Sequence, residues 1–257
     1  MQRVITSFML LLVLTMSGYA QKKVYVGLGV NRSSFQDQKF SDLHIVGNGL
    51  NFQYGIEKLK EKKLVGFDLQ VFYSNETPST YKYSTSVFRP VINYYHLRKI
   101  NDRLFIGGKW NIADIYLRTT EGLGNNGSYM DFSSNLMASA VYYFPLGKKK
   151  LKAAIDLGLI GYTKSSTSFA YKAPHPVLVD GKFNMQNSSI NTLMGKAGAE
   201  FKPVWDDIRL NMELTYAFSK RLEVCYQWKL RRYSTVKNYP TTYGMNAVTF
   251  RYNIKNR

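Results

Sequence analysis

The sequence predicts an all-β membrane protein, a transmembrane antiparallel up-and-down β-barrel. Three observations predict it: long strands of strict alternation near the C-terminus, an N-terminal segment built like a secretory signal peptide, and a chain of 257 residues with 20 Tyr and 15 Phe. Strands of soluble sheets are usually about five or six residues long. A strand that crosses a bilayer at a tilt needs about 9–11 residues, and the alternating segments of this chain reach that length.

The clearest alternation lies between residues 206 and 254. One face of each segment is apolar, as in Ile208 and Leu210, and the other is polar, as in Arg209 and Glu213. Successive side chains of a strand point to opposite faces. These segments therefore predict an apolar outer surface and a charged interior.

Residues 1–20 have the order of a secretory signal peptide. A positive end at Arg3 precedes an apolar stretch over 8–16, and small residues stand just before Gln21. The apolar stretch is too short for a transmembrane helix, which needs about 20 residues. We therefore expect a single barrel domain over 21–257.

Composition and charge agree with a barrel and limit its partners. The aromatic residues fit girdles at the two membrane interfaces, and half of all strand residues would face a polar interior, so a mean hydropathy of −0.27 is no obstacle. The net charge of +18 is concentrated partly in the lysine-rich turns 57–63 and 148–150. These turns either contact phosphate-bearing lipids or are simply solvated. No nucleic-acid-binding motif accompanies the charge, so nucleic acid is not an expected partner.

The strands follow one another along the chain, separated by turn signals. Residues 165–186 are ambiguous, because Pro174 and Pro176 fit a sheet poorly and the stretch is either one long loop or a strand, a turn and the start of another strand. The clear segments are 23–32, 46–57, 64–74, 83–97, 104–118, 132–144, 151–164, 189–201, 208–218, 222–231 and 248–254.

Parity sets the expected strand count. Bacterial single-chain barrels have an even number of strands, so one more strand is needed, and Ser165 to Lys172 is the best candidate. That gives the favoured count of twelve strands. If two of the clear segments form one bent strand, the count is ten.

The chain resembles the outer-membrane β-barrel families of Gram-negative bacteria. The signal peptide, the alternation of strands and turns, and the aromatic last strand from Thr249 to Ile254 carry the resemblance, although Asn253 to Arg257 follow the last aromatic residue, Tyr252. It implies a bacterial outer-membrane location with both termini periplasmic. It also implies contact with outer-membrane lipids, including lipopolysaccharide. Fold does not fix function.

The inward faces carry the candidate site residues. Mixed charge predicts an interior closed by ion pairs, because an unpaired charge in a confined site is costly, whereas an excess of Lys and Arg would suit a small porin-like channel with a mild anion preference. Asp114 lies on an otherwise apolar face with Ile112 and Tyr116, which predicts a β-bulge. The lumen-facing candidates are Asp68, Arg89, Lys109, Asp156, Arg209, Glu213, Glu223, Lys229, Arg231 and Arg251.

Catalytic and metal-binding patterns are weak. A membrane lipid hydrolase would need a His-x-Ser pair on one strand, and none of His44, His96 or His175 is followed in that way. The scattered histidines and the single cysteine, Cys225, predict no metal, cofactor or disulfide. The sequence therefore favours a structural or accessory barrel that binds a protein partner through loops 122–129 and 165–186. A porin-like channel is the alternative, and a lipid hydrolase is the least supported.

Overall fold

The structure is a computed structural model, and it describes residues 21–38, 44–78, 84–121, 127–147, 149–167, 199–236 and 239–256. The regular elements in these ranges are all β-strands, and no helix there is long and apolar enough to cross a membrane. The signal peptide expected at 1–20 lies outside the described residues.

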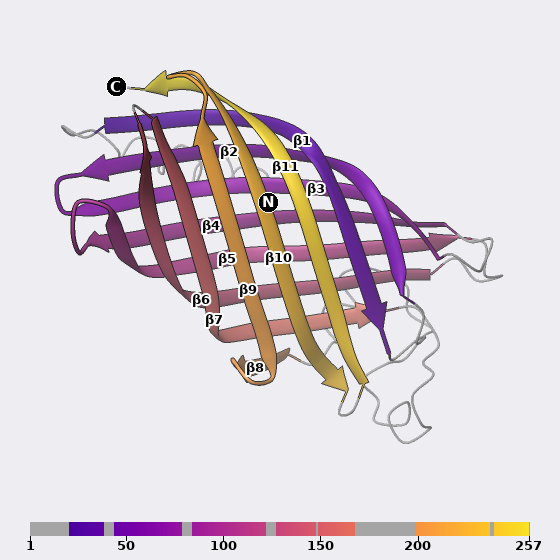
Figure 1. Cartoon of the computed structure of the whole chain (residues 1–257). Helices are drawn as coiled ribbons and strands as arrows, with labels where there is room; N and C mark the ends of the chain where they lie inside the picture. Colours follow the sequence, from indigo (N-terminus) through magenta and orange to yellow (C-terminus); the bar gives the residue numbers. More distant parts are fainter. Residues whose placement is uncertain are drawn as a thin grey trace, which may run out of the picture.

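Ten long antiparallel strands close a barrel (Figure 1). Each strand pairs with the next along the chain, and the barrel closes where β1 pairs with β11. A short eleventh strand, β8, pairs with β7 within the described part of the chain and takes no part in this closure. The strands are β1 (Gln21–Asp37), β2 (Ile45–Lys60), β3 (Lys63–Pro78), β4 (Ser84–Lys99), β5 (Leu104–Glu121), β6 (Gly127–Leu146), β7 (Lys149–Thr167), β8 (Ala199–Pro203), β9 (Asp207–Ala217), β10 (Leu222–Val236) and β11 (Tyr239–Asn256).

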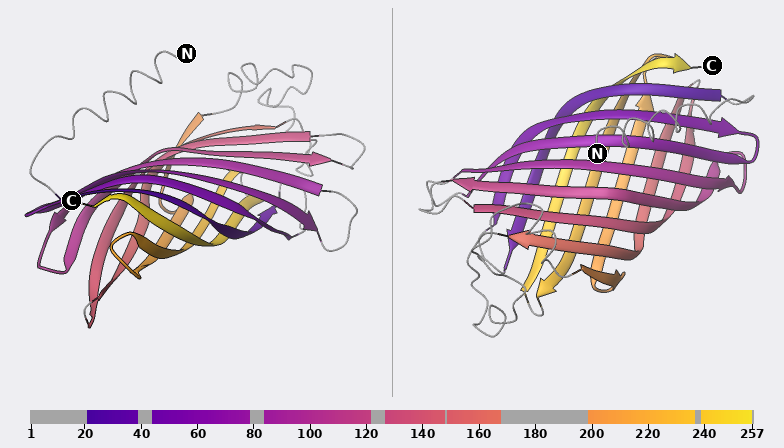
Figure 2. Two further views of the ribbon diagram at one scale, coloured as in Figure 1. Left: turned by 90° about the horizontal axis from the view of Figure 1, so that it is seen from above. Right: turned by 180° about the vertical axis from the view of Figure 1, so that it is seen from behind.

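The two ends of the barrel differ. Tight turns join β2 to β3, β4 to β5, β6 to β7 and β9 to β10 at one end, which we call the turn end. The start of β1 and the end of β11 also lie there, since Lys23 is paired with Asn256. Gly147 in the β6–β7 turn has φ of 61°, a conformation that favours glycine. The opposite end is called the loop end, and the strands run between the two at a marked tilt (Figure 2).

The strand count is the smaller of the two expected values, and the favoured count of twelve is corrected to ten. Residues 165–167 continue β7 instead of starting a separate strand, and 168–172 lie outside the described residues. Two clear segments also share one neighbour. β8 pairs with Ile160–Lys164 of β7 and β9 pairs with Leu151–Leu157 of the same strand, so they occupy one position beside β7.

Several strands extend beyond their predicted ends toward the loop end. β1 continues to Asp37, which is paired with Thr241 of β11, although the predicted strand ended at Arg32. Outward residues there include Arg32 and Ser34. The two faces therefore no longer differ in polarity, although the hydrogen-bonded pairing continues. The bulge predicted near Asp114 is confirmed: the β5–β6 register shifts between Asn111 and Asp114, and Asp114 is buried inside.

Candidate functional site: the barrel interior

The structure brings the ten candidate residues together on the inner wall. Lys109 and Glu213 are half-buried and the other eight are buried. They form contacts at successive levels between the turn end and the loop end, and many of these contacts join strands that are not neighbours in the sheet. The interior is therefore crossed by side chains.

The level nearest the turn end contains two ion pairs. Lys23 Nζ of β1 lies 2.6 Å from the Glu223 carboxylate of β10. Lys152 of β7 pairs with Glu57 of β2, which also accepts a hydrogen bond of 2.8 Å from the Tyr95 hydroxyl. Because β2 and β7 are far apart in the strand order, the Lys152–Glu57 pair spans the lumen.

The next level is a network around Arg251 and Asp68. Arg251 lies 2.9 Å from Glu213 and donates to the Gln53 side chain at 2.8 Å. On the opposite wall Asp68 accepts a hydrogen bond of 2.7 Å from Gln70. Lys229 of β10 donates to Gln70 of β3 across the lumen, and Lys109 pairs with Asp156 at 2.8 Å.

A row of alternating charges forms the level beyond. Arg89 makes two hydrogen bonds of 2.7 Å to Asp114, a bidentate geometry that is among the strongest for an ion pair. Arg209 lies 3.3 Å from Asp114 and 3.1 Å from Asp207, and Arg231 lies 2.9 Å from Asp207. We call these five residues, which come from β4, β5, β9 and β10, the charge row. Its three cations share two anions, and every member has an opposite charge beside it.

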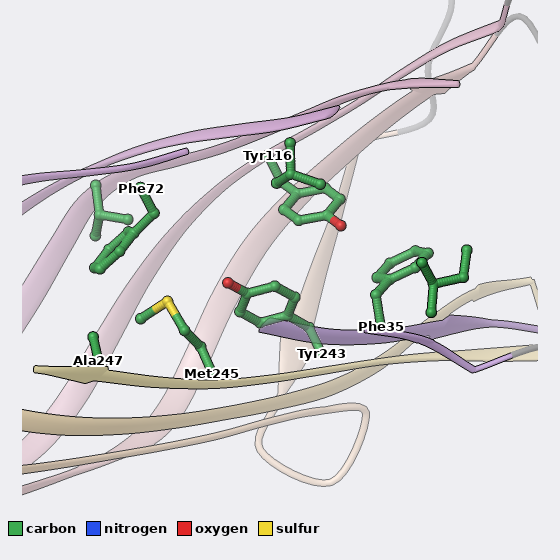
Figure 3. Close-up of a cluster of buried hydrophobic side chains, with 9 residues drawn as sticks. Phe35, Phe72, Tyr116, Tyr243, Met245 and Ala247 are labelled. Carbon is green, nitrogen blue, oxygen red and sulfur yellow. The ribbon is translucent and has the colours of Figure 1, made fainter. Parts of the chain in front are cut away.

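Aromatic side chains close the level nearest the loop end (Figure 3). The rings of Phe35 and Tyr116 stack with 5.5 Å between centroids, and Tyr243 meets Tyr116 edge-on at the same distance. Arg118 lies over the Phe35 ring at 4.4 Å. Phe35, Tyr116 and Tyr243 come from β1, β5 and β11, and we call these three residues the aromatic plug.

The space inside the barrel narrows from the turn end to the loop end. A cavity of about 520 Å³ opens at the turn end and is lined by Phe105, Tyr143 and the two ion pairs nearest that end; we call it the vestibule. Deeper cavities measure about 50, 20 and 10 Å³. Since one water needs at least about 10–15 Å³, the two smallest of these cavities hold at most a water or two.

The vestibule rim is charged and exposed. Lys60, Glu61 and Lys150 stand on it together with Lys99 and Asp102 of the β4–β5 turn. Lys99 donates a hydrogen bond of 2.8 Å to Asp102, and this bond lowers the pKa of the Asp102 carboxyl. The rim therefore carries both signs of charge.

Sequence reasoning missed the aromatic plug. The composition predicts aromatic residues in the outer girdles, yet Phe35 and Tyr116 are 1% and 5% exposed and point inward. For Tyr116 the available signal was its proximity to the bulge at Asp114, because a bulge reverses the faces of the residues that follow. Asp207 was missed because the predicted strand began one residue later.

A serine–histidine pair was also missed. Ser34 Oγ lies 3.1 Å from His44 Nε2 on the exposed surface of the β1–β2 hairpin, ten residues apart and not in the His-x-Ser spacing. Ser34 lies within a strand that is paired with β2 on one side and β11 on the other. The neighbouring backbone amides are thus engaged in the sheet and not free to stabilise an oxyanion.

Metal-binding and thiol chemistry have little support in the described part of the chain. No group of three or more His, Cys, Asp or Glu side chains there is placed to hold a metal ion. Cys225 is a free thiol, buried inside the barrel with no exposed surface. The charged groups of the interior are instead arranged in ion pairs that link the strands of the wall.

Comparison with known proteins finds no matching family model and no matching curated protein. Among solved structures, the translocator domain of the autotransporter NalP from Neisseria meningitidis is 12% identical over 97% of this chain and 95% of that chain, with a TM-score of 0.49. The outer membrane protease OmpT from Escherichia coli is 7% identical over 93% and 100%, with a TM-score of 0.48. Neisserial surface protein A is 8% identical over 90% and 97%, with a TM-score of 0.39. TM-scores below 0.5 support no assignment, so the class of protein is argued from the geometry of the barrel itself.

The barrel has the opposite distribution of polarity to a soluble protein, with apolar side chains outside and charged side chains inside. Large apolar side chains such as Leu28, Leu50 and Phe250 are 59–69% exposed around the outside, while charged residues are buried inside. An apolar surface of that extent marks contact with another apolar phase. In lipid, a closed barrel is one of two architectures that satisfy every backbone hydrogen bond. With its long tilted strands and polar interior, this chain has the architecture of a transmembrane β-barrel, the kind found in outer-membrane proteins.

Proposed function

We propose that this protein is a non-conducting barrel of the bacterial outer membrane that serves as a scaffold or accessory protein. The turn end, with both termini, faces the periplasm, because short turns are periplasmic and longer loops extracellular in this class. Residues 1–20 act as the signal peptide for export. Partner binding belongs to segments 122–129 and 165–186, of which 122–126 and 168–186 lie outside the described residues while the rest continues β6 and β7. Lipopolysaccharide surrounds the barrel on the loop-end side.

The observation that carries this proposal is the side-chain closure of the lumen. The charge row and the aromatic plug join strands on different sides of the wall. An ion that passed through would have to break contacts between buried, paired charges. The alternative of an anion-preferring channel needs a ring of uncompensated cations, whereas Arg89, Arg209 and Arg231 each lie against an aspartate.

Single-channel recording in planar bilayers tests this proposal. The purified mature protein is inserted at a density measured by a fluorescent label, and we expect insertion without steady conductance. The matched variant combines Phe35→Ala, Tyr116→Ala and Asp207→Asn, which removes the plug and weakens the charge row, and we expect it to conduct. Steady anion-selective conductance of the unmodified protein would refute the proposal and make Arg89, Lys109 and Lys229 candidate filter residues.

A further inference from the structure

The outer face of the turn end carries a set of cations that the interior does not use. Lys63 and Arg98 stand at the ends of β3 and β4, Lys149 starts β7, Arg221 precedes β10 and Lys22 lies near the start of β1. Strand alternation points Arg98 outward, since its neighbour Leu97 is fully buried inside. We call these five residues the outer collar.

Two members of the outer collar face each other with like charge. Lys63 and Arg98 are direct cross-strand partners in the β3–β4 ladder. Like charges at directly opposed positions destabilise a sheet. In the described part of the chain, no ion pair with a carboxylate relieves either side chain. An anion from outside the chain that lay between them would relieve this repulsion.

The nearest carboxylates point elsewhere. Glu57, Glu61, Asp102 and Glu223 all line the vestibule or its rim. The turn end therefore separates its charges: acids and bases are mixed toward the vestibule, whereas the outer collar is formed by cations. A ligand attracted to this outer face must carry negative charge.

The outer collar also contacts aromatic residues of the outer surface. Lys149 Nζ lies 5.3 Å from the centroid of the Tyr216 ring and 5.9 Å from that of Phe218. Arg221 donates a hydrogen bond of 3.4 Å to the Tyr252 hydroxyl. Phe218 and Tyr252 are 50% and 46% exposed on the outer face. A ligand that reaches both the cations and these rings is an amphiphile with an anionic head.

We propose that the outer collar binds the phosphate groups of anionic phospholipids in the leaflet at the turn end. Arg98 and Arg221 suit bidentate contact with phosphate oxygens, and the acyl chains continue along Phe218 and its neighbours. This inference takes the membrane placement of the proposed function as given. It does not depend on whether the lumen conducts, because lipid selectivity and conductance are measured separately.

Spin-label electron paramagnetic resonance on the full mature barrel tests the inference. The protein is reconstituted in phosphatidylcholine vesicles, and the motionally restricted fraction is compared for spin-labelled phosphatidylglycerol and phosphatidylcholine. We expect the phosphatidylglycerol to be favoured about threefold or more, with the preference falling as salt is raised. Arg98→Gln with Lys149→Gln should bring the ratio close to one.

The matched control removes the same amount of charge from the vestibule side of the turn end. Lys60→Gln with Lys150→Gln alters two vestibule-rim lysines, and its lipid preference should stay at the level of the unmodified protein. An equal loss in both double variants, or no preference in the unmodified protein, would overturn the outer collar as a lipid site. Folding of each variant is checked by its heat-dependent gel mobility. If the test variant fails this check, single Arg98→Gln replaces it, and if the control fails, single Lys150→Gln replaces it.

Discussion

Phe35 of β1 stacks on Tyr116 of β5, although β2, β3 and β4 separate these strands in the wall. A contact between such distant strands is made through the lumen, so it braces the barrel as well as closing it. Stacked aromatic rings contribute beyond the area they bury. Closure and stability at the loop end therefore depend on the same side chains.

Removing a ring of the aromatic plug should destabilise the barrel. Phe35→Ala deletes a ring that is 1% exposed and contacts both Tyr116 and Arg118. Comparable core substitutions cost about 3–5 kcal/mol, and we expect that loss in the free energy of unfolding by urea in detergent micelles. Phe35→Leu, which keeps most of the volume, should cost clearly less. If Phe35→Ala lowers the free energy of unfolding by less than about 1 kcal/mol, water replaces the ring without cost and the aromatic plug does not stabilise the barrel.

The charge row makes a second prediction, centred on Asp207. This aspartate is the partner of Arg209 and Arg231, and its side chain is only 1% exposed. Asp207→Asn would leave three guanidinium groups with one carboxylate, and breaking a buried pair costs about 3–5 kcal/mol. The neighbouring Asp206 is exposed, so Asp206→Asn is a matched control that should change stability by less than about 0.5 kcal/mol. Equal effects of the two variants would contradict the charge row as a structural element.

The sequence predicted the barrel because its two faces differ in chemistry over whole strands. The alternation of Ile208 and Arg209 continues through β9, and the structure places the first outside and the second inside. The number of strands and their ends near the loop end were harder to predict. Alternation alone does not show that β8 and β9 share β7 as a neighbour. Pairings across the lumen, such as Tyr116 with Phe35, depend on barrel closure and on a bulge, and neither is encoded by a local pattern.

The lumen-spanning pair of Lys152 and Glu57 predicts a non-additive mutant cycle. Lys152→Met removes the ion-pair partner of Glu57, which keeps the hydrogen bond from the Tyr95 hydroxyl and has Lys23 opposite it in the ladder. Glu57→Gln leaves Lys152 without its anion. Each single change should cost about 3 kcal/mol, and the double variant should recover part of that loss because no uncompensated charge remains. Urea unfolding of the four proteins measures the coupling. Strictly additive losses would show that the two side chains do not interact across the lumen.

The pair of Ser34 and His44 gives a test of the hydrolase alternative. Acyl transfer needs a serine, a base and oxyanion donors, and the amides beside Ser34 are engaged with neighbouring strands. We expect no fatty-acid release from phospholipid vesicles that contain the protein, with or without calcium. Release that disappears in both Ser34→Ala and His44→Ala, but persists in His96→Ala, would replace the scaffold assignment with an enzymatic one.

Cys225 offers a direct measure of how closed the lumen is. Its thiol is fully buried on the inner wall of β10. It does not itself line the vestibule, although its cross-strand partner Thr215 does. A water-soluble maleimide added to the folded barrel should leave it unlabelled for hours, and the same reagent in denaturant should label it completely. The control is Lys150→Cys in a Cys225→Ser background, which places a thiol on the exposed vestibule rim and should react within minutes. If Cys225 in the folded protein reacts as fast as the rim thiol, water and reagent reach the inner wall beyond the vestibule. The side-chain network would then be open, and the channel alternative would gain over the scaffold.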